Sequence, residues 1–575
     1  MAGRLTGMEG ERLATAYVAD RFAALGLDPA GDDGGMFQPF DFTAGVALAE
    51  GNRLSISIDG KAAPLTLATE WRPLAFSRTG ETEKASVLFA GYGLVAPAEG
   101  KLPAIDSYGE LDAKDKWVLL WRGMPGDISN EHRTHLSRYA DLRYKASVAK
   151  SRGAAGVIFA PPSREGFEDG LPRLAYKANM GVAGIPVVAV RRAAASRMLA
   201  ILGNDLKDMT VKIEAGKTDG SDLIGVSISG VIALNFETRS GRNVLARLDL
   251  DGLAQAGRPP LVIGAHLDHI GRGETSNSLA SGDQRGQIHR GADDNASGVA
   301  ALIEVAQKLA ADRAAGRLKG TRDIIFAAWS GEELGLLGSS HFVKTLAKRN
   351  GAEDLSDLVS AYLNMDMVGR LKDRVVVLGL ASSDIWAREV ERRNAVVGLP
   401  VIAADNPYGP TDSTAFYLQK VPILAFFTGA HEDYHKPSDT ADKLNYAGMR
   451  DIARFVALIA RSRVRAEEEP NYVAIERPKG QGGRRMSKVF LGTIPDYASE
   501  GQRGVPLSGV IKGGPAEQAG LTGGDVVVGL AGQDLENIYD YVRTLNGLKP
   551  GEAVDITVER KGMRKSFSIK PSVRN

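Results

Sequence analysis

Histidines and carboxylates of metal-binding type cluster in the middle of the chain, each just beyond a predicted strand or at the start of a predicted helix. They are His266, Asp268, Asp294, Glu332, Glu333, Asp366 and His435. Two histidines with at least three carboxylates suit a pair of divalent cations bridged by one carboxylate. Without cations, carboxylates gathered at one place would repel one another. The residue types therefore predict a dinuclear metal centre.

Two acidic groupings have spacings that suggest a division of roles. Residues two apart in an extended chain share a face, so Asp268 can orient the His266 imidazole without binding metal itself. Adjacent Glu332 and Glu333 point in different directions, so one can bind metal while the other accepts a proton from water. Alone, a His-x-Asp pair is more often structural, and a Glu-Glu pair often begins a helix. The prediction therefore depends on their joint position after apolar runs.

The elements that must hold these residues are apolar strands alternating with longer helical patterns, from Asn243 to about Val464. Strands are expected at 261–266, 323–329, 359–365, 374–378 and 421–427. This alternation predicts an α/β fold with a doubly wound, mostly parallel sheet whose site lies at the carboxyl ends of the strands. An amphipathic helix is expected at 8–26, with an apolar face formed by Leu13, Tyr17, Val18, Phe22 and Leu25.

Composition changes along the chain suggest further parts. Short β-like runs with Gly- and Pro-rich loops between about Ala85 and Val190 predict a small α+β unit. A charged, Gly-rich stretch at 466–486 reads as a linker, and the remainder is long enough for a compact domain. We therefore expect a discontinuous catalytic domain at 1–50 and 225–465, an inserted domain at 51–224, a linker at 466–486 and a last domain at 487–575.

Composition excludes several classes of function. The 71 Lys and Arg residues nearly cancel the 70 Asp and Glu residues, so no overall field favours nucleic acid. No apolar run approaches the roughly 20 residues that span a bilayer. The chain has no cysteine, which excludes a disulfide framework, a cysteine nucleophile and thiolate zinc sites. Any metal must therefore be bound by histidines and carboxylates.

Five motifs, found in order, resemble those of the M28 zinc peptidases. They are His266-x-Asp268, Gly291-Ala-Asp-Asp-Asn-Ala-Ser-Gly298, Trp329-Ser-Gly-Glu-Glu-Leu334, Asn364-Met-Asp-Met367 and Asp433-Tyr-His435. The resemblance implies one zinc on His266 and Asp366, another on Glu333 and His435, and Asp294 bridging both. It also implies Glu332 as the general base, Tyr434 as the phenol that stabilises the oxyanion, and a cis peptide after Asp294. Cobalt and manganese accept the same ligands.

Two flanking segments resemble known modules. Residues 108–118 and 145–156 are similar to a protease-associated (PA) domain, for which a generic α+β insertion is the alternative. The end of the chain is similar to a PDZ domain, whose loop Phe490-Leu491-Gly492-Thr493 would receive the C-terminal carboxylate of a peptide. A docking module that binds no free peptide is the alternative there. Bacterial peptidases that combine these modules are usually exported, which predicts a periplasmic or secreted enzyme whose signal peptide is absent from this chain.

These features together predict an aminopeptidase that cleaves the first peptide bond of substrates with a free N-terminus. A related zinc-dependent carboxypeptidase or amide hydrolase is the alternative, because the motifs specify the chemistry better than the substrate. Ser413 stands where related sequences often carry histidine, so specificity is not transferred. A non-catalytic, receptor-like scaffold is a third hypothesis, but it would be expected to have broken ligands.

A different class of zinc protease uses a helical His-Glu-x-x-His motif, and residues 431–435 match it literally. That motif needs one continuous helix. Pro437 disfavours helical geometry at the residue before it, so this interpretation is rejected.

Overall fold

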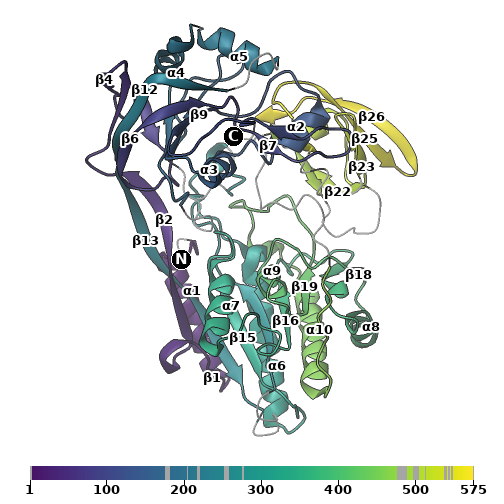
Figure 1. The fold of residues 1–575 in the computed structure, drawn as a ribbon. Coiled ribbons are helices and arrows are strands. Elements are labelled where there is room, and N and C mark those ends of the chain that lie inside the picture. The colour runs from purple at the N-terminus through teal and green to yellow at the C-terminus, as the bar shows by residue number, and fades with distance from the viewer. Residues whose placement is uncertain are drawn as a thin grey trace.

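Three large sheets organise the chain in the computed structural model (Figure 1). The structure describes residues 3–174, 182–203, 205–215, 220–250, 258–274, 277–280, 282–475, 489–495, 504–511, 513–535, 541, 544–545 and 548–573. Within these residues, no helix has the length and apolar character needed to cross a membrane.

The first sheet has nine strands in the order β1-β13-β15-β14-β16-β19-β17-β18, with β2 also paired to β13. Their bounds are β1 Asp28–Pro29, β2 Phe37–Leu48, β13 Leu234–Leu248, β14 Leu261–His266, β15 Ile324–Trp329, β16 Ala361–Met365, β17 Val375–Leu378, β18 Val401–Ala404 and β19 Ile423–Phe427. The central strands β15, β14, β16 and β19 are mutually parallel, whereas β13 and β17 join them antiparallel. The predicted α/β fold with a parallel centre is confirmed, with antiparallel pairings toward its edges.

Helices cover both faces of this sheet, as a doubly wound fold requires. One face carries α1 (Glu9–Ala24), α6 (Gly298–Ala314), α8 (Trp386–Val397) and α10 (Tyr446–Arg465), which share a core with the sheet. The other face carries α7 (Leu337–Asn350) and α9 (Ser413–Tyr417), packed around Trp329 and Tyr362. The strands are therefore buried on both sides, which explains their continuous apolar runs.

The helix expected at 8–26 forms as α1, but its predicted apolar face is partly wrong. Val18 and Phe22 are buried, whereas Leu13 and Tyr17 are 41% and 52% exposed. The buried stripe instead includes Glu11 and Thr15, which hydrogen-bond to Arg242 of β13. Polar contacts with a distant strand therefore decided the orientation of this helix.

The second sheet has eight strands in the order β4-β3-β12-β6-β9-β10-β11-β5. Their bounds are β3 Arg53–Ile58, β4 Lys61–Pro64, β5 Trp71–Pro73, β6 Gly80–Phe89, β9 Trp117–Trp121, β10 Gly156–Ala160, β11 Val187–Val190 and β12 Ser221–Ile232. Helices α2 (Asn130–Leu136), α3 (Leu142–Ser151), α4 (Arg192–Leu199) and α5 (Leu206–Glu214) accompany it. The expected boundary at residue 224 falls inside β12, so this sheet continues to Ile232. Its assignment as a PA domain stays a prediction.

A buried lysine lies at the carboxyl end of strand β9 in this second sheet. Lys145 of α3 has no exposed surface. Its Nζ donates hydrogen bonds to the carbonyl oxygens of Trp121 (3.1 Å) and Gly123 (2.6 Å), where β9 ends. Burial lowers the pKa of Lys145 to about 7.

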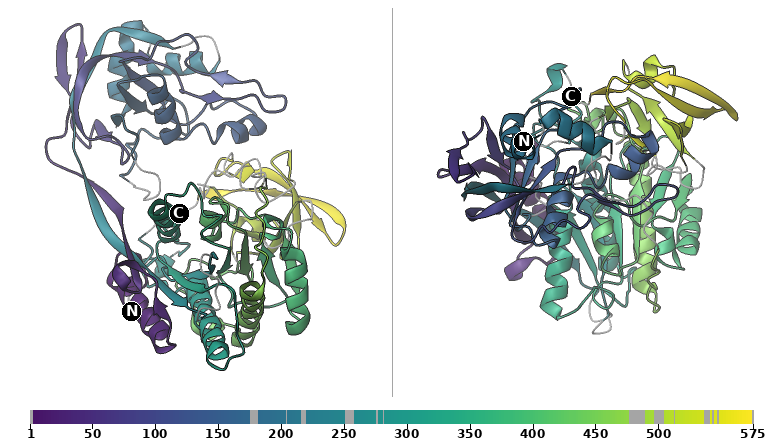
Figure 2. Two further views of the ribbon diagram at one scale, coloured as in Figure 1. Left: turned by 60° about the horizontal axis from the view of Figure 1, so that its bottom comes forward. Right: turned by 45° about the horizontal axis from the view of Figure 1, so that its top comes forward.

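A long two-stranded ribbon joins the first two sheets. Strands β2 and β13 pair antiparallel from Phe37 with Val244 to Leu48 with Leu234, and the ribbon leads from the first sheet toward the second (Figure 2). Beyond it, the amide of Ala49 donates to the carbonyl of Ala233 at 3.0 Å. The chain therefore leaves and re-enters the first sheet at adjacent points.

The third sheet has six strands: β21 (Thr493–Pro495), β22 (Val505–Val510), β23 (Val526–Leu530), β24 (Gln533–Asp534), β25 (Val554–Arg560) and β26 (Met563–Ile569). A short helix, α11 (Pro515–Gln518), and the pair β20 (Val489–Phe490) with β27 (Ser572–Val573) complete it. Most of the linker and most of the helix expected around residues 535–545 lie outside the described residues.

Candidate metal centre

The predicted ligands meet at the carboxyl ends of the parallel strands. His266 is the last residue of β14, Asp366 follows β16, and Glu333 lies four residues beyond β15. Asp294 lies in the turn that leads into α6, and His435 lies in the turn beyond β19. Strand and helix ends at one edge of a parallel sheet face a common space, so residues up to 169 positions apart become neighbours.

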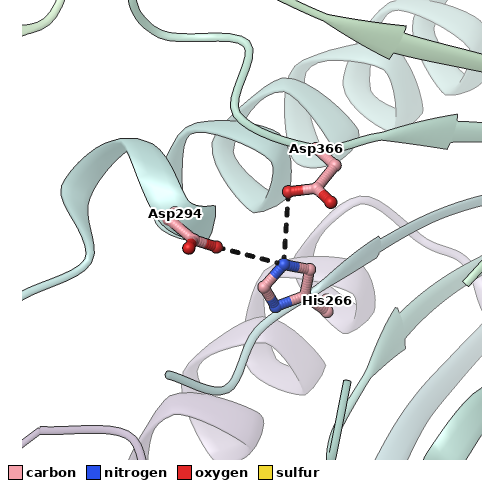
Figure 3. Close-up of side chains that lie close together, drawn as sticks. All are labelled: His266, Asp294 and Asp366. Carbon is pink, nitrogen blue, oxygen red and sulfur yellow. Dashed lines mark hydrogen bonds and ion pairs between the residues drawn. The ribbon is translucent and has the colours of Figure 1, made fainter. Parts of the chain in front are cut away.

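His266 is flanked by two carboxylates (Figure 3). Its Nε2 lies 3.3 Å from Oδ1 of Asp294 and 3.3 Å from Oδ1 of Asp366. Zinc bonds of about 2.0–2.2 Å in a tetrahedral arrangement place ligand atoms about 3.3 Å apart. These three atoms therefore have the spacing of ligands around one ion.

A second group of the same kind lies on the other side of Asp294. Nε2 of His435 is 3.1 Å from Oδ2 of Asp294 and 3.2 Å from Oε2 of Glu333. Asp294 thus presents a different carboxylate oxygen to each histidine. This arrangement fits a carboxylate that bridges two cations.

Two buried atoms of the second group support the presence of an ion. Within the described part of the chain, neither His435 Nε2 nor Glu333 Oε2 makes a hydrogen bond of acceptable geometry, although both are buried. Buried polar atoms are rarely left without partners, and a cation between them would bind both. The donor set contains only imidazole nitrogen and carboxylate oxygen, which suits zinc, manganese or cobalt. The residues present therefore fit the metals that the sequence predicts.

The charges of these side chains balance through the histidines. Burial by itself lowers the pKa of His435, but Glu333 and Asp294 raise it to about 10. Burial likewise favours neutral Asp294, yet the adjacent imidazoles of His266 and His435 hold its pKa well below the ordinary value. The protonated imidazoles thus stand in for cations. Metal binding would displace these protons, because only neutral histidine binds a metal.

Asp268 holds the loop that carries Glu332 and Glu333 in place. Its carboxylate accepts hydrogen bonds from the amides of Glu332 (3.1 Å) and Glu333 (3.3 Å) and from the Thr6 hydroxyl (3.1 Å). Nδ1 of His266 lies 3.3 Å from the Asp268 carbonyl oxygen and 3.7 Å from its carboxylate. Asp268 therefore contacts the histidine that it was expected to orient, and it also fixes both glutamates.

The turn around Asp294 is held from both sides. Asp439 accepts hydrogen bonds from the amides of Asp293 (2.8 Å) and Asp294 (3.1 Å). The Asn295 side chain donates to the Met365 carbonyl at 2.9 Å, beside the strand end that carries Asp366. The peptide between Asp294 and Asn295 is cis, as the family resemblance implied.

The remaining catalytic candidates lie beside these ligands. Glu332 is buried, and its charge is one of the influences that raise the pKa of His266. The Tyr434 ring stacks on the His435 ring, with centroids 3.8 Å apart. His435 itself has a left-handed backbone, with φ of 54°. Residues 431–435 form a turn, so the helical His-Glu-x-x-His interpretation is excluded.

His269 is a further residue of this centre, and it was not predicted from the sequence. This residue has no exposed surface, and its Nδ1 lies 2.9 Å from Oε1 of Glu333. The available signal was its position, since His269 follows Asp268 directly, three residues beyond the end of β14. Asn277 was also missed, and its carbonyl oxygen lies 2.8 Å from Nδ1 of His435.

The expected peptide-binding loop of the third sheet is partly engaged by its own domain. The carbonyl oxygens of Leu491 and Gly492 accept hydrogen bonds from Ala516 and Ile511, each at 2.7 Å. Thr493 begins β21, which lies at one end of the sheet order with β22 as its neighbour. Binding of a peptide beside residues 490–493 stays a prediction.

Comparison with known proteins finds two family matches. Residues 243–460 match the model of peptidase family M28, and residues 484–570 match that of the PDZ domain. The first segment contains every proposed metal ligand.

Individual relatives cover different shares of the chain. Leupeptin-inactivating enzyme 1 of Streptomyces exfoliatus is 31% identical over 32% of this chain and 35% of its own length. Aminopeptidase YwaD of Bacillus subtilis (strain 168) is 23% identical over 69% of this chain and 72% of its own. Among solved structures, the aminopeptidase from Aneurinibacillus sp. strain AM-1 is 20% identical, covering 83% of this chain and 93% of that one, with a TM-score of 0.44.

Proposed function

We propose that this protein is a zinc-dependent aminopeptidase with a dinuclear centre. Its residues 243–460 form an M28 peptidase domain, and it carries a PDZ domain near its C-terminus. The observation that carries the proposal is the position of Asp294, whose two carboxylate oxygens face two separate histidine–carboxylate pairs. The relatives named as aminopeptidases support the choice of substrate.

The proposed ligands are His266 and Asp366 for one ion, and Glu333 and His435 for the other, with Asp294 shared. When bound, zinc would polarise the scissile carbonyl and lower the pKa of the attacking water. The surrounding protein supplies orientation, because Asp268, Asp439 and Asn295 fix the loops that carry the ligands.

Glu332 is the proposed general base. It lies next to a metal ligand in sequence, it is buried beside His266, and its amide donates a hydrogen bond to Asp268. It takes a proton from the attacking water and delivers it to the leaving amine. The Tyr434 phenol, held by stacking on His435, donates a hydrogen bond to the oxyanion of the tetrahedral intermediate.

The substrates are proposed to be peptides with a free N-terminus, and the 490–493 loop is proposed to receive a peptide C-terminus. Action in the periplasm or outside the cell is proposed from the resemblance to exported bacterial peptidases. Fractionation of cells that produce the full-length protein from its own gene would test the location.

The deciding experiment measures hydrolysis of aminoacyl-chromophore substrates beside their N-acetylated forms, with and without chelator. Cleavage of only the free-amine substrates, abolished by chelator and restored by zinc, is the expected result. Glu332→Gln should lower kcat by about 10²–10⁴-fold while retaining zinc. Glu304→Gln, on the exposed side of α6, is the matched control and should leave kcat unchanged. Cleavage of acetylated substrates would instead indicate an endopeptidase, carboxypeptidase or amide hydrolase.

A further inference from the structure

His269 is a third buried histidine in the metal centre, and the proposed ligand scheme gives it no role. Its Nδ1 lies 2.9 Å from Oε1 of Glu333 and 4.0 Å from Oδ2 of Asp294. Its ring meets the His435 ring edge-on, with centroids 5.7 Å apart. His269 therefore touches the group of residues proposed for the second ion.

The distances distinguish two roles for this histidine, that of a metal ligand and that of a hydrogen-bond donor to a metal ligand. Ligands of one tetrahedral zinc lie about 3.3 Å apart, and His435 Nε2 has that spacing from both of its carboxylate neighbours, at 3.1 and 3.2 Å. His269 Nδ1 lies 4.0 Å from Asp294 Oδ2, which is longer than the spacing of ligands around one tetrahedral zinc. Its distance from Glu333 Oε1 is that of an ordinary N–H···O hydrogen bond.

The two oxygens of Glu333 differ accordingly. Oε1 accepts the hydrogen bond from His269, whereas Oε2 has no hydrogen-bond partner among the described residues and lies 3.2 Å from His435 Nε2. A carboxylate held in this way offers one oxygen to a cation and keeps the other occupied. The backbone of the same residue is fixed as well, because the Asn277 side chain donates to the Glu333 carbonyl at 2.8 Å.

We propose that His269 is a positioning residue for the second zinc: its Nδ1–H holds Glu333 so that only Oε2 faces the ion. This inference rests on the proposed dinuclear function. Partners that orient a metal ligand in this way typically change metal affinity by about 10–100-fold. His269 should therefore control the affinity of one ion and leave the other unaffected.

Two substitutions separate the hydrogen bond from the bulk of the side chain. His269→Leu removes the donor and keeps an apolar group of moderate size. His269→Asn places an amide nitrogen close to the position of Nδ1 and so retains the donor. Both are made in the full chain and in a His266→Ala background, which removes the only histidine proposed for the first site.

Zinc affinity is measured by competition with a chromophoric chelator. In the His266→Ala background, His269→Leu should weaken zinc binding by about 10–100-fold, and His269→Asn should recover most of the loss. In the otherwise unchanged chain, His269→Leu should weaken one of two binding events. Thermal unfolding of the zinc-free proteins serves as the control for folding, and the variants should match their parents.

Other outcomes overturn the inference. Unchanged zinc affinity in His269→Leu would mean that the contact with Glu333 has no effect on the ion. Complete loss of the second ion in both His269 variants would make His269 itself a ligand. Binding of fewer than two zinc ions by the unsubstituted chain would instead refute the dinuclear function, independently of His269.

Discussion

The first and second sheets both have parallel strands at their centres, yet their strand ends differ in chemistry. In the first sheet, His266 ends β14 and Asp366 follows β16, so ionisable groups face one another. In the second, β9 ends at Trp121, and the ammonium of Lys145 binds the carbonyl oxygens there. The carboxyl ends of the strands thus gather groups of metal-binding type in the first sheet, whereas a lysine of the protein occupies the corresponding position in the second.

The largest expected effect comes from removing the charge that the two proposed ions share. Asp294→Asn keeps the size of the side chain but weakens both sites at once, so tightly bound zinc should be lost. Because a catalytic metal supplies several kcal/mol of transition-state stabilisation, activity should fall by about 10³-fold or more. Zinc content and kcat/KM are measured together. Asp20→Asn, on the exposed surface of α1, is the control and should behave like the unsubstituted protein.

Removing zinc should destabilise the first sheet selectively. A ligand present at about 1,000 times its Kd stabilises the folded state by about 4 kcal/mol, so chelation should lower the unfolding temperature of the part that binds it. The second sheet, closed by Lys145, should unfold at an unchanged temperature. Differential scanning calorimetry with and without chelator tests this contrast. Equal shifts of both transitions would show that the two sheets unfold as one unit.

Lys145→Met should destabilise the second sheet and leave the first sheet unchanged, the opposite of zinc removal. Two buried carbonyl oxygens would lose their donor, at a cost of about 1–3 kcal/mol to the second sheet, whereas zinc content and kcat should not change. The pKa of Lys145 is about 7 when folded and 10.5 in the ordinary case. Its favourable contribution is therefore complete above pH 10.5 and is lost as the pH falls through 7. The free energy of unfolding, measured in urea across this range, should rise with pH, and Lys145→Met should abolish this pH dependence.

The effect confined to the narrowest conditions belongs to Glu11, a buried acid of helix α1, which packs against the first sheet. Burial raises its pKa to about 7 from 4.5. Its contribution to stability is therefore complete below pH 4.5 and is lost as the pH rises through 7, the reverse of the Lys145 dependence. Glu11→Gln should stabilise the first sheet by about 1–3 kcal/mol at pH 8, with little change at pH 4.5. An equal effect of the substitution at both pH values would contradict this assignment.

The sequence predicted the parts of the fold that local patterns encode. Apolar runs located β14 to the residue, and the residues predicted after such runs include His266, Asp294 and Asp366, which the structure brings together. Contacts between distant segments were not predictable in this way. Nothing local indicates that Thr6 bonds Asp268, or that Leu13 and Tyr17 face outward because Glu11 and Thr15 bond Arg242. His269 was missed because its partner, Glu333, lies 64 positions away.

The ribbon of β2 and β13 has a consequence for how the protein is assembled. These strands form a hairpin whose connection, in place of a tight turn, is a folded body that begins and ends at the hydrogen-bonded residues Ala49 and Ala233. Loop-closure entropy grows only with the logarithm of loop length, and a connection that is already folded presents its two ends at a fixed separation. The hairpin therefore closes nearly as easily as one with a short loop. Replacing the connection by an Asn-Gly turn should preserve the register of the two strands.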